Sequence, residues 1–437
     1  MVNDINVNRK GYKKTSLGWI PEDWEIKHFG EVFNYLRTFS YSRECLTYDS
    51  NVDKIKYIHY GDIHASFKSE FLDFDSFKRV PFLIDSTISK SASEDPDFPF
   101  LKDGDLIIVD VSEDYEGIGK CIELTNVNNS KAISGLHTFA VRDSKGLTAN
   151  GFRTYILNNK SIVKEIKRIA TGISVYGISK SNLSKINIII PSISEQILIA
   201  KLLNCWNIAV EKTQDLIELK EKRKKALMQQ LLSGKKRVKG FNDKWKTLPI
   251  ADVVVPTLRP VNKPTNLFLA LGIRSHGKGT FLKHNFNPDN IEMDILYEVK
   301  ENDLITNITF AWEGAIAIVK KDDEGALVSH RFPTYTFNSI NGVVDYFRYI
   351  IIQPRFKYFL ELISPGGAGR NRVLNKNNFL KLEIKLPSVK EQKAIASILR
   401  TADKEIDLLN QKLESFKKQK KGLMQVLLTG KIRVKTK

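Results

Sequence analysis

The chain has 437 residues, 42% of them hydrophobic and 27% charged, which is enough to build two or three cores and excludes a disordered or fibrous protein. Lys and Arg outnumber Asp and Glu by 68 to 50, and the net charge of +18 favours a nucleic-acid partner, although a simple surplus of surface lysine would give the same count. No apolar run approaches the ~20 residues of a membrane helix. The scattered Cys45, Cys121 and Cys205 fit neither a disulfide framework nor a zinc site, so we expect a cytoplasmic protein.

The first globular segment, residues 1–190, contains short apolar runs bounded by Gly, Asn and Asp, which predict a mixed α and β unit. Two of its stretches, GDIHASFK and TGISVYGISK, are predicted to be loops that contact nucleic acid. The candidate side chains are His64, Lys68, Thr171, Ser174, Tyr176 and Lys180. Each of them alone is more simply explained as an exposed side chain or part of a turn. Only their clustering supports a binding role.

Residues 191–234 are predicted to form one long helix. Pro191 ends the preceding strand-like run, and Ser192 with Glu195 has the spacing of a capping box. No proline follows until Gly234, which suits the end of a helix because glycine adopts positive φ easily. The basic run ELKEKRKKALMQQLL near its end is explained either as a solvated face or as a contact with phosphates or a partner subunit.

The second globular segment, residues 235–386, opens with GFNDKWKTLP, which resembles GWIPEDW near the start of the chain. Its candidate nucleic-acid contacts lie in two glycine-containing stretches, RSHGKGTF and SPGGAGRNRVLNK, because glycine lets a backbone approach a ligand closely. Arg and Lys pair with guanine edges, and Ser or His pair with several bases or phosphates. The candidates are Arg274, Ser275, His276, Lys278, Arg370, Asn371, Arg372 and Lys376.

Residues 387–437 repeat the first helix at a constant shift of 196 positions, so that PSVKEQKAIASIL lies over PSISEQILIAKLL. Apolar residues alternate at spacings of four and three in both copies, which is typical of a coiled-coil seam. The predicted seam residues are Ile199, Leu203, Val210, Ile217 and Leu227 in the first helix, and Ile395, Leu399, Ile406, Leu413 and Leu423 in the second. Because globular and helical segments alternate, the helices should pair antiparallel. The predicted fold class is therefore α+β, with two mixed α/β domains related by a pseudo-two-fold axis and joined by an antiparallel coiled coil.

Several enzyme motifs are missing from the sequence. We find no phosphate-binding GxxxxGK[ST] loop, no Asn-Pro-Pro stretch of adenine methyltransferases, no GxSxG or HExxH, and no histidine spacing that suits a metal. A methyltransferase with its own recognition domains is therefore disfavoured. A stand-alone DNA-binding protein and a coiled-coil adaptor for proteins stay open as alternatives.

GWIPEDW, the P-S-x-x-E-Q start of each long helix and the L-M-Q-x-L-L-[ST]-G-K endings resemble the specificity subunit of a type I restriction–modification system over essentially the whole chain. The resemblance implies a non-catalytic subunit that binds double-stranded DNA, with one target recognition domain for each half of a bipartite, asymmetric target. It further implies helices that set the gap and dock two modification subunits, with two restriction subunits completing the complex. S-adenosylmethionine, ATP and Mg would then be bound by the partner subunits, and this chain would bind no cofactor and no metal.

Overall fold

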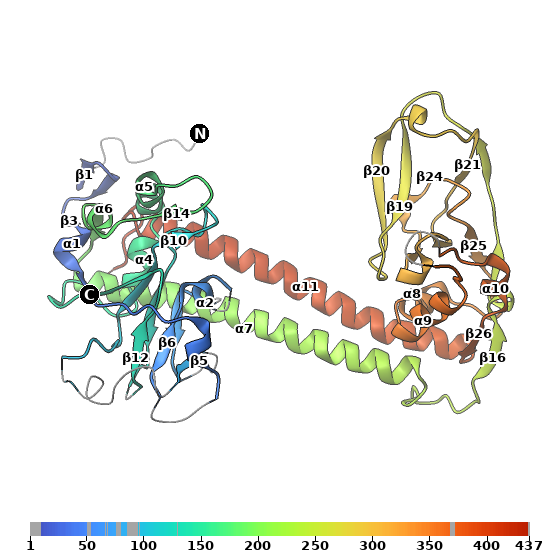
Figure 1. Cartoon of the computed structure of the whole chain (residues 1–437), viewed down its shortest axis with the longest axis horizontal. Helices are drawn as coiled ribbons and strands as arrows, with labels where there is room; N and C mark the ends of the chain where they lie inside the picture. The colour runs from blue at the N-terminus through green and yellow to red at the C-terminus, as the bar shows by residue number, and fades with distance from the viewer. Residues whose placement is uncertain are drawn as a thin grey trace. The chain divides into compact units, whose positions relative to one another are not determined.

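The computed structural model describes residues 10–49, 54–65, 67, 69–75, 80–84, 95, 97–128, 130–367 and 372–435. The chain divides into two compact units. Unit 1 is made of Met1–Asp215 with Gln411–Lys437, and unit 2 is Leu216–Asn410. The two long helices, α7 (Ile193–Leu232) and α11 (Val389–Leu427), each contribute a segment to both units (Figure 1).

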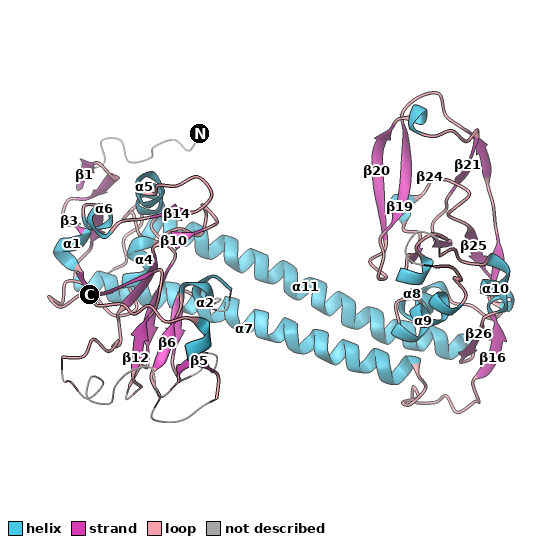
Figure 2. Cartoon of the chain, in the orientation of Figure 1, coloured by secondary structure: helices cyan, strands magenta, loops and turns pink. Residues whose placement is uncertain are grey.

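Unit 1 contains two main sheets, two-stranded pairs and short helices (Figure 2). In sheet order, the strands are β4 (Asn34–Tyr35), β13 (Thr138–Arg142), β9 (Leu106–Val109), β11 (Cys121–Thr125) and β7 (Phe71–Asp73), and then β12 (Ala132–Ser134), β6 (Lys56–Ile58), β8 (Phe82–Leu83) and β5 (Leu46–Thr47). The pairs are β1 (Tyr12–Thr15) with β2 (Gly18–Pro21), β3 (Glu25–His28) with β15 (Asn187–Ile190), and β10 (Val111–Ser112) with β14 (Tyr176–Gly177). The helices are α1 (Phe29–Val32), η1 (Arg43–Cys45), α2 (Tyr60–Ala65), α4 (Arg153–Leu157), α5 (Lys160–Ile169) and α6 (Lys180–Ser184).

Unit 2 has the same kinds of elements. Its sheets are, in order, β17 (Val254–Pro256), β25 (Thr334–Phe337), β22 (Leu304–Thr306) and β23 (Ile316–Ile318), and then β18 (Pro260–Asn262), β21 (Ile295–Glu298), β24 (Leu327–Val328), β19 (Phe268–Ile273) and β20 (Thr280–Phe286). β16 (Lys246–Pro249) pairs with β26 (Glu383–Leu386). The helices are η2 (Ile250–Asp252), η3 (Pro288–Asn290), η4 (Ala311–Glu313), η5 (Lys321–Asp323), α8 (Val344–Ile350), α9 (Pro354–Leu362) and α10 (Lys376–Lys381).

The two units share a framework. The antiparallel run β4-β13-β9-β11 of unit 1 has the order of β17-β25-β22-β23 in unit 2, and β3–β15 matches β16–β26. A buried aspartate opens the central strand in both units. Asp105 pairs with Arg142 and accepts the Lys102 amide in unit 1, while Asp303 pairs with Arg259 and accepts the Lys300 amide in unit 2. The prediction of two related mixed α/β units is confirmed.

The ends of the long helices belong to the cores of the units. Ile199 and Leu203 of α7 and Leu427 of α11 are buried in one apolar cluster with Trp24 of unit 1. In unit 2, Ile395 and Leu399 of α11 lie in a cluster with Leu231 of α7 and Phe379 of α10. Each helix therefore packs on a globular unit at its ends as well as on its partner helix.

The helices pair antiparallel, as predicted. In unit 2, Lys220 contacts Glu405 and Lys224 contacts Asp403, so the partner's number falls as that of α7 rises. In unit 1, the rings of Trp206 and Phe416 meet edge to face with centroids 5.7 Å apart. Of the predicted seam residues, the structure buries Ile199, Leu203, Ile217, Ile395, Leu399, Ile406 and Leu413, and it half-buries Val210, Leu227 and Leu423.

Candidate DNA interface

The P-S-x-x-E-Q motif fixes the start of each long helix to its unit. Glu195 accepts two hydrogen bonds from the Arg433 guanidinium, at 2.6 and 2.8 Å, and one from the Trp24 indole at 2.8 Å. Glu391 accepts the same set from Arg237, at 2.7 Å twice, and from Trp245 at 3.3 Å. We call these two groups the unit 1 clasp (Trp24, Glu195, Arg433) and the unit 2 clasp (Trp245, Glu391, Arg237).

The clasps correct the capping-box prediction. Ser192 and Ser388 do receive the amide hydrogen bond three residues on, at 3.4 Å in both helices. The glutamates do not reach back to the N-cap backbone, because their buried carboxylates are held by the arginine and tryptophan. Each carboxylate raises the pKa of its arginine, Glu195 that of Arg433 and Glu391 that of Arg237. A charge buried with a bidentate arginine is an anchor for the unit.

The glutamine of the motif holds a loop of the recognition unit. Gln196 accepts the Ala149 amide at 2.8 Å and donates to the Leu147 carbonyl at 3.1 Å. Gln392 accepts the Val343 amide at 3.0 Å and donates to the Asn341 carbonyl at 2.8 Å. The sequence showed the repeat but not this role. The only indication of this role in the sequence was that Glu-Gln recurs at the same place in both copies of the motif.

The structure brings the two candidate stretches of unit 1 together. Gly117 lies against both His64 and Ser112, since a Cβ atom built on it would be 2.7 Å from Cε1 of His64 and 2.9 Å from Oγ of Ser112. Ser112 of β10 in turn pairs with Tyr176 of β14. The prediction that His64 lies in a loop is wrong, because β6 leads directly into α2. Lys68 lies outside the described residues.

The side chains of the second stretch differ in exposure. Thr171 and Ser174 are exposed, while Tyr176 is half-buried and packs edge to face on Tyr115 at 4.9 Å. Lys180 is exposed and opens α6, and its amine lies 5.6 Å from the centre of the Tyr35 ring. The ring attracts the Lys180 amine and so keeps it in a defined place at the surface.

A group of rings beside His64 escaped the sequence analysis. The Tyr60 ring lies 4.5 Å from His59, 6.3 Å from His64 and 5.3 Å from His137. Burial lowers the pKa of both His59 and His64, and nearby Arg43 and Lys120 lower them further. These effects favour the neutral form of both imidazoles, although Asp114 raises the pKa of His64 in part. Nothing in the local sequence pattern indicated that His137 would meet Tyr60 and its two neighbouring histidines.

In unit 2 the predicted loop is the turn between β19 and β20. The Arg274 amide donates to the Gly279 carbonyl at 2.9 Å, and His276 has φ of 62°. His276 and Lys278 are exposed. The Arg274 guanidinium donates to the Thr280 carbonyl at 3.0 Å and lies 4.9 Å from the Phe281 ring centre.

The short helix η4 joins this loop to the second candidate stretch. Glu313 accepts a hydrogen bond from the Ser275 hydroxyl at 2.6 Å, and its carbonyl accepts the His276 amide at 2.8 Å. The neighbouring Trp312 carries the Arg372 guanidinium 5.0 Å from its ring centre. Trp312 and Glu313 are thus the residues that organise both stretches, and the sequence analysis singled out neither.

The structure places the other candidates of the glycine-rich stretch in different surroundings. Arg372 donates to the carbonyls of Ser364 and Glu361 at 3.3 and 3.2 Å, so much of its hydrogen-bonding capacity is used within the unit. Lys376 is exposed at the start of α10. Arg370 and Asn371 lie outside the described residues.

Within the described ranges, no three His, Cys, Asp or Glu side chains are placed to hold a metal ion. A search of the same residues finds no helix with the length and apolar character needed to span a membrane. The fold defines a protein with two related mixed α/β units, each carrying part of two matched long helices.

The chain belongs to the family described as type I restriction modification DNA specificity domain, whose model matches residues 21–225 and 242–418. It is 24% identical over 462 aligned positions to the putative type I restriction enzyme MjaX specificity subunit of Methanocaldococcus jannaschii, with 98% of both chains covered. It is 26% identical over 290 positions to the MjaVIII specificity subunit of the same organism, covering 62% of this chain and 68% of that one. The resemblance noted in the sequence is confirmed.

The fold is similar to two solved structures. One is the S subunit of a type I restriction–modification system from M. genitalium, with a TM-score of 0.53 and 14% identity over 95% of this chain and 97% of the other. The second comes from a study of complex assembly and conformational transition of the type I R-M system, with a TM-score of 0.56 and 11% identity over 94% of this chain and 99% of the other.

Proposed function

We propose that this chain is the non-catalytic DNA-recognition subunit of a type I restriction–modification complex, in which each unit binds one half of a bipartite, asymmetric DNA sequence. The observation that carries the proposal is the contrast between framework and loops. The clasps, the glutamine contacts and the central antiparallel strands occur twice. The candidate DNA contacts mostly differ between the units, since Tyr176 corresponds to Arg372 at the shift of 196 positions, and Arg274 and Lys278 correspond to Ile63 and Phe67 when GIRSHGKG is laid over GDIHASFK. Lys180 and Lys376, the first residues of α6 and α10, are the exception.

The repeated helices suit a spacer and docking role. Two matched helix starts, each clasped to one unit, would offer two equivalent places for a partner, as expected for two copies of a modification subunit. Two restriction subunits would complete the complex. S-adenosylmethionine, ATP and Mg would be bound by those partners, and the whole complex would act on DNA in the cytoplasm of a bacterium or an archaeon.

Adenine methylation across the genome tests the proposal. Cells that carry this gene and the gene of its methyltransferase partner are compared by single-molecule sequencing with cells that lack only this gene. We expect one split motif to be methylated in the first and unmethylated in the second. If methylation is the same in both, this chain does not direct it, and the proposal is wrong.

The salt dependence of binding separates DNA recognition from a protein adaptor. The purified complex should bind a duplex that contains the split motif with an affinity that falls steeply between 50 and 200 mM salt, conditions over which phosphate contacts are weakened strongly. A duplex with the motif scrambled is the control. Equal affinity for both duplexes would contradict sequence recognition.

A further inference from the structure

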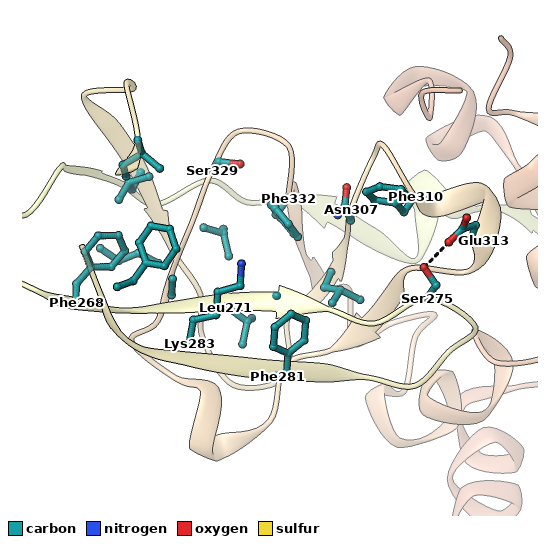
Figure 3. Close-up of a pocket in the computed structure, with 18 residues that line it drawn as sticks. Phe268, Leu271, Ser275, Phe281, Lys283, Asn307, Phe310, Glu313, Ser329 and Phe332 are labelled. Atoms are coloured by element: carbon teal, nitrogen blue, oxygen red, sulfur yellow. Dashed lines mark hydrogen bonds between the residues drawn. The ribbon is translucent and has the colours of Figure 1, made fainter. Parts of the chain in front are cut away.

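Unit 2 contains a cleft of about 420 Å³ beside the candidate DNA loop (Figure 3). The β19–β20 hairpin forms one wall, and the segment around η4 and the end of β24 form the other. This volume lies in the range of small-molecule sites, roughly 300–1,000 Å³.

Aromatic rings surround the cleft. Its lining includes five phenylalanines that are only half-buried, namely Phe268, Phe281, Phe286, Phe310 and Phe332. Large apolar side chains are normally buried, and a concave group of them that stays open marks a binding site. In Figure 3, Phe281 projects from one side of the space, and Phe310 and Phe332 lie on the other.

Polar groups gather at the end of the cleft nearest the candidate loop. Ser275, Asn307 and Glu313 line it there, and Ser275 donates to the Glu313 carboxylate at 2.6 Å. A carboxylate has about four acceptor positions, so one serine leaves room for a further donor. An amino group of a base is such a donor, as in the pairing of Glu with the cytosine amino group.

The rim of the cleft is basic. Lys283 is exposed and lines the cleft, and the exposed Arg274 lies against Phe281 of its lining. Arg274 lies 4.9 Å from the Phe281 ring centre, and Lys283 lies 5.8 Å from that ring and 5.6 Å from Phe286. A positive rim would hold the sugar-phosphate backbone while a base enters the apolar interior.

We propose that this cleft receives a nucleobase that leaves the stack of the DNA bound by unit 2. The base would stack on the phenylalanine rings and present an amino group to Glu313, so adenine, cytosine and guanine are favoured over thymine. The proposal rests on the proposed DNA-recognition function. The base in this cleft would be a second extruded base. It is distinct from the base that the modification partner extrudes for methylation.

Fluorescent bases test the proposal in the complex of this chain with its modification partner. The duplex carries the split motif found by methylation sequencing, with 2-aminopurine at one purine or pyrrolocytosine at one cytosine of the second half-site or its flanks. We expect a several-fold rise in fluorescence on binding at one such position. The methylated adenine, extruded by the methyltransferase itself, gives a separate signal.

Three variants locate the signal. Ser329→Trp fills the cleft from its lining, and it should abolish the rise at the proposed position while leaving the signal of the methylated adenine unchanged. Glu313→Gln should reduce the rise without filling the space. Tyr358→Leu alters an aromatic that is 56% exposed and does not line the cleft, and it should change neither signal.

The outcomes distinguish this site from the proposed function. If the wild-type complex binds the motif specifically but no second-half position brightens, or if Ser329→Trp leaves the rise intact, the base site is wrong and the recognition role stands. If Ser329→Trp instead weakens capture of the modification partner, the occupant is a protein side chain, and the base site is again wrong. If the complex does not prefer the motif at all, the proposed function fails, and the base site fails with it.

Discussion

The two clasps have the same chemistry but are assembled from different parts of the chain. In unit 2, Arg237 and Trp245 follow shortly after α7 and meet Glu391 at the start of α11. In unit 1, Arg433 comes from the end of the described chain, and Trp24 comes from near its beginning. Arg433 also pairs with the Asp23 carboxylate, at 2.8 and 2.9 Å, whereas in unit 2 Arg237 donates to the backbone carbonyl of Asp243 at 2.8 Å.

The comparison teaches that the same Glu–Arg–Trp contact forms in both units, whether or not its arginine and tryptophan are neighbours in the sequence. Unit 1 must be closed by contacts between segments that no short connection holds together, and an added carboxylate strengthens the contact there. Unit 2 obtains the same geometry from residues that are closer in sequence. The two units also differ at the seam and in the sheet, and these differences allow direct tests.

The largest effect should come from an exchange of recognition surface. Replacing residues 255–370 by the same segment of a relative should change the second half of the methylated motif and leave the first half as it was, because the candidate contacts of unit 1 lie outside this segment. Methylation sequencing measures both halves at once. A change in both halves would contradict separate recognition by the two units.

Breaking the clasps should give the largest stability effect. Arg433→Ala leaves the Glu195 carboxylate, which is 1% exposed, without its cation, and should destabilise unit 1 by about 3 kcal/mol. Arg237→Ala should do the same to unit 2 through Glu391, also 1% exposed. Hydrogen exchange followed by mass spectrometry reports each unit separately.

The clasp variants serve as controls for each other. Each should accelerate exchange in its own unit and leave the other protected. Arg433→Lys keeps the charge but loses the bidentate geometry, so its effect should be intermediate. Equal loosening of both units by either variant would show that the clasps do not act locally.

Unit 1 should also respond to pH in a way that unit 2 does not. Glu123 of β11 pairs in register with Leu106, where unit 2 has the apolar Ile318 beside Leu304. Burial raises the pKa of Glu123 from 4.5 to about 7, against the opposing effect of hydrogen bonds from the Gly151 and Thr154 amides. The folded state therefore keeps a proton that the unfolded chain has already lost above pH 4.5.

The stability that Glu123 contributes is thus greatest below pH 4.5 and falls as the pH rises to about 7, by on the order of 3 kcal/mol. Glu123→Gln removes this titration. Between pH 4.5 and pH 8 the wild type should therefore lose stability relative to the variant. Hydrogen exchange of unit 1 measures the unfolding free energy of both proteins across this range. A difference that is constant with pH would refute the raised pKa.

The seam gives the smallest effects, and they should differ between its two ends. Trp206→Ala removes the edge-to-face contact with Phe416 and part of an apolar surface, and should destabilise unit 1 by about 2 kcal/mol at any salt concentration. Lys220→Ala removes an ion pair with Glu405 whose side chains are 23% and 47% exposed, and should cost unit 2 about 0.5 kcal/mol, less in 1 M salt. Thermal unfolding at low and high salt checks both. A salt-dependent loss for Trp206→Ala would contradict the apolar character of this end.

The candidate DNA interface shows where sequence reasoning ended. The glycines and basic residues of the loop Arg274–Gly279 identified a turn, since positive φ at His276, Gly277 and Gly279 is a local property. Trp312, Glu313 and the phenylalanines of the cleft were not found, because strands β19, β20 and β24 and helix η4 bring them together over long sequence separations. The glycine-containing pattern of GDIHASFK predicted a loop at His64, whereas the structure has the helix α2 there.

The sequence by itself determined the repeated architecture, because helix caps, the spacing of apolar residues and a constant shift of 196 positions are all local or periodic signals. It also predicted that a glycine with positive φ follows each helix. The helices end at Leu232 and Leu427, and Gly234 and Gly430 just beyond them have φ of 72° and 67°. Only the tertiary structure decided what Glu195 and Glu391 do. Their spacing fits a capping box, but a buried carboxylate is stabilised more by an arginine than by one backbone amide, and that arginine is supplied from elsewhere in the chain.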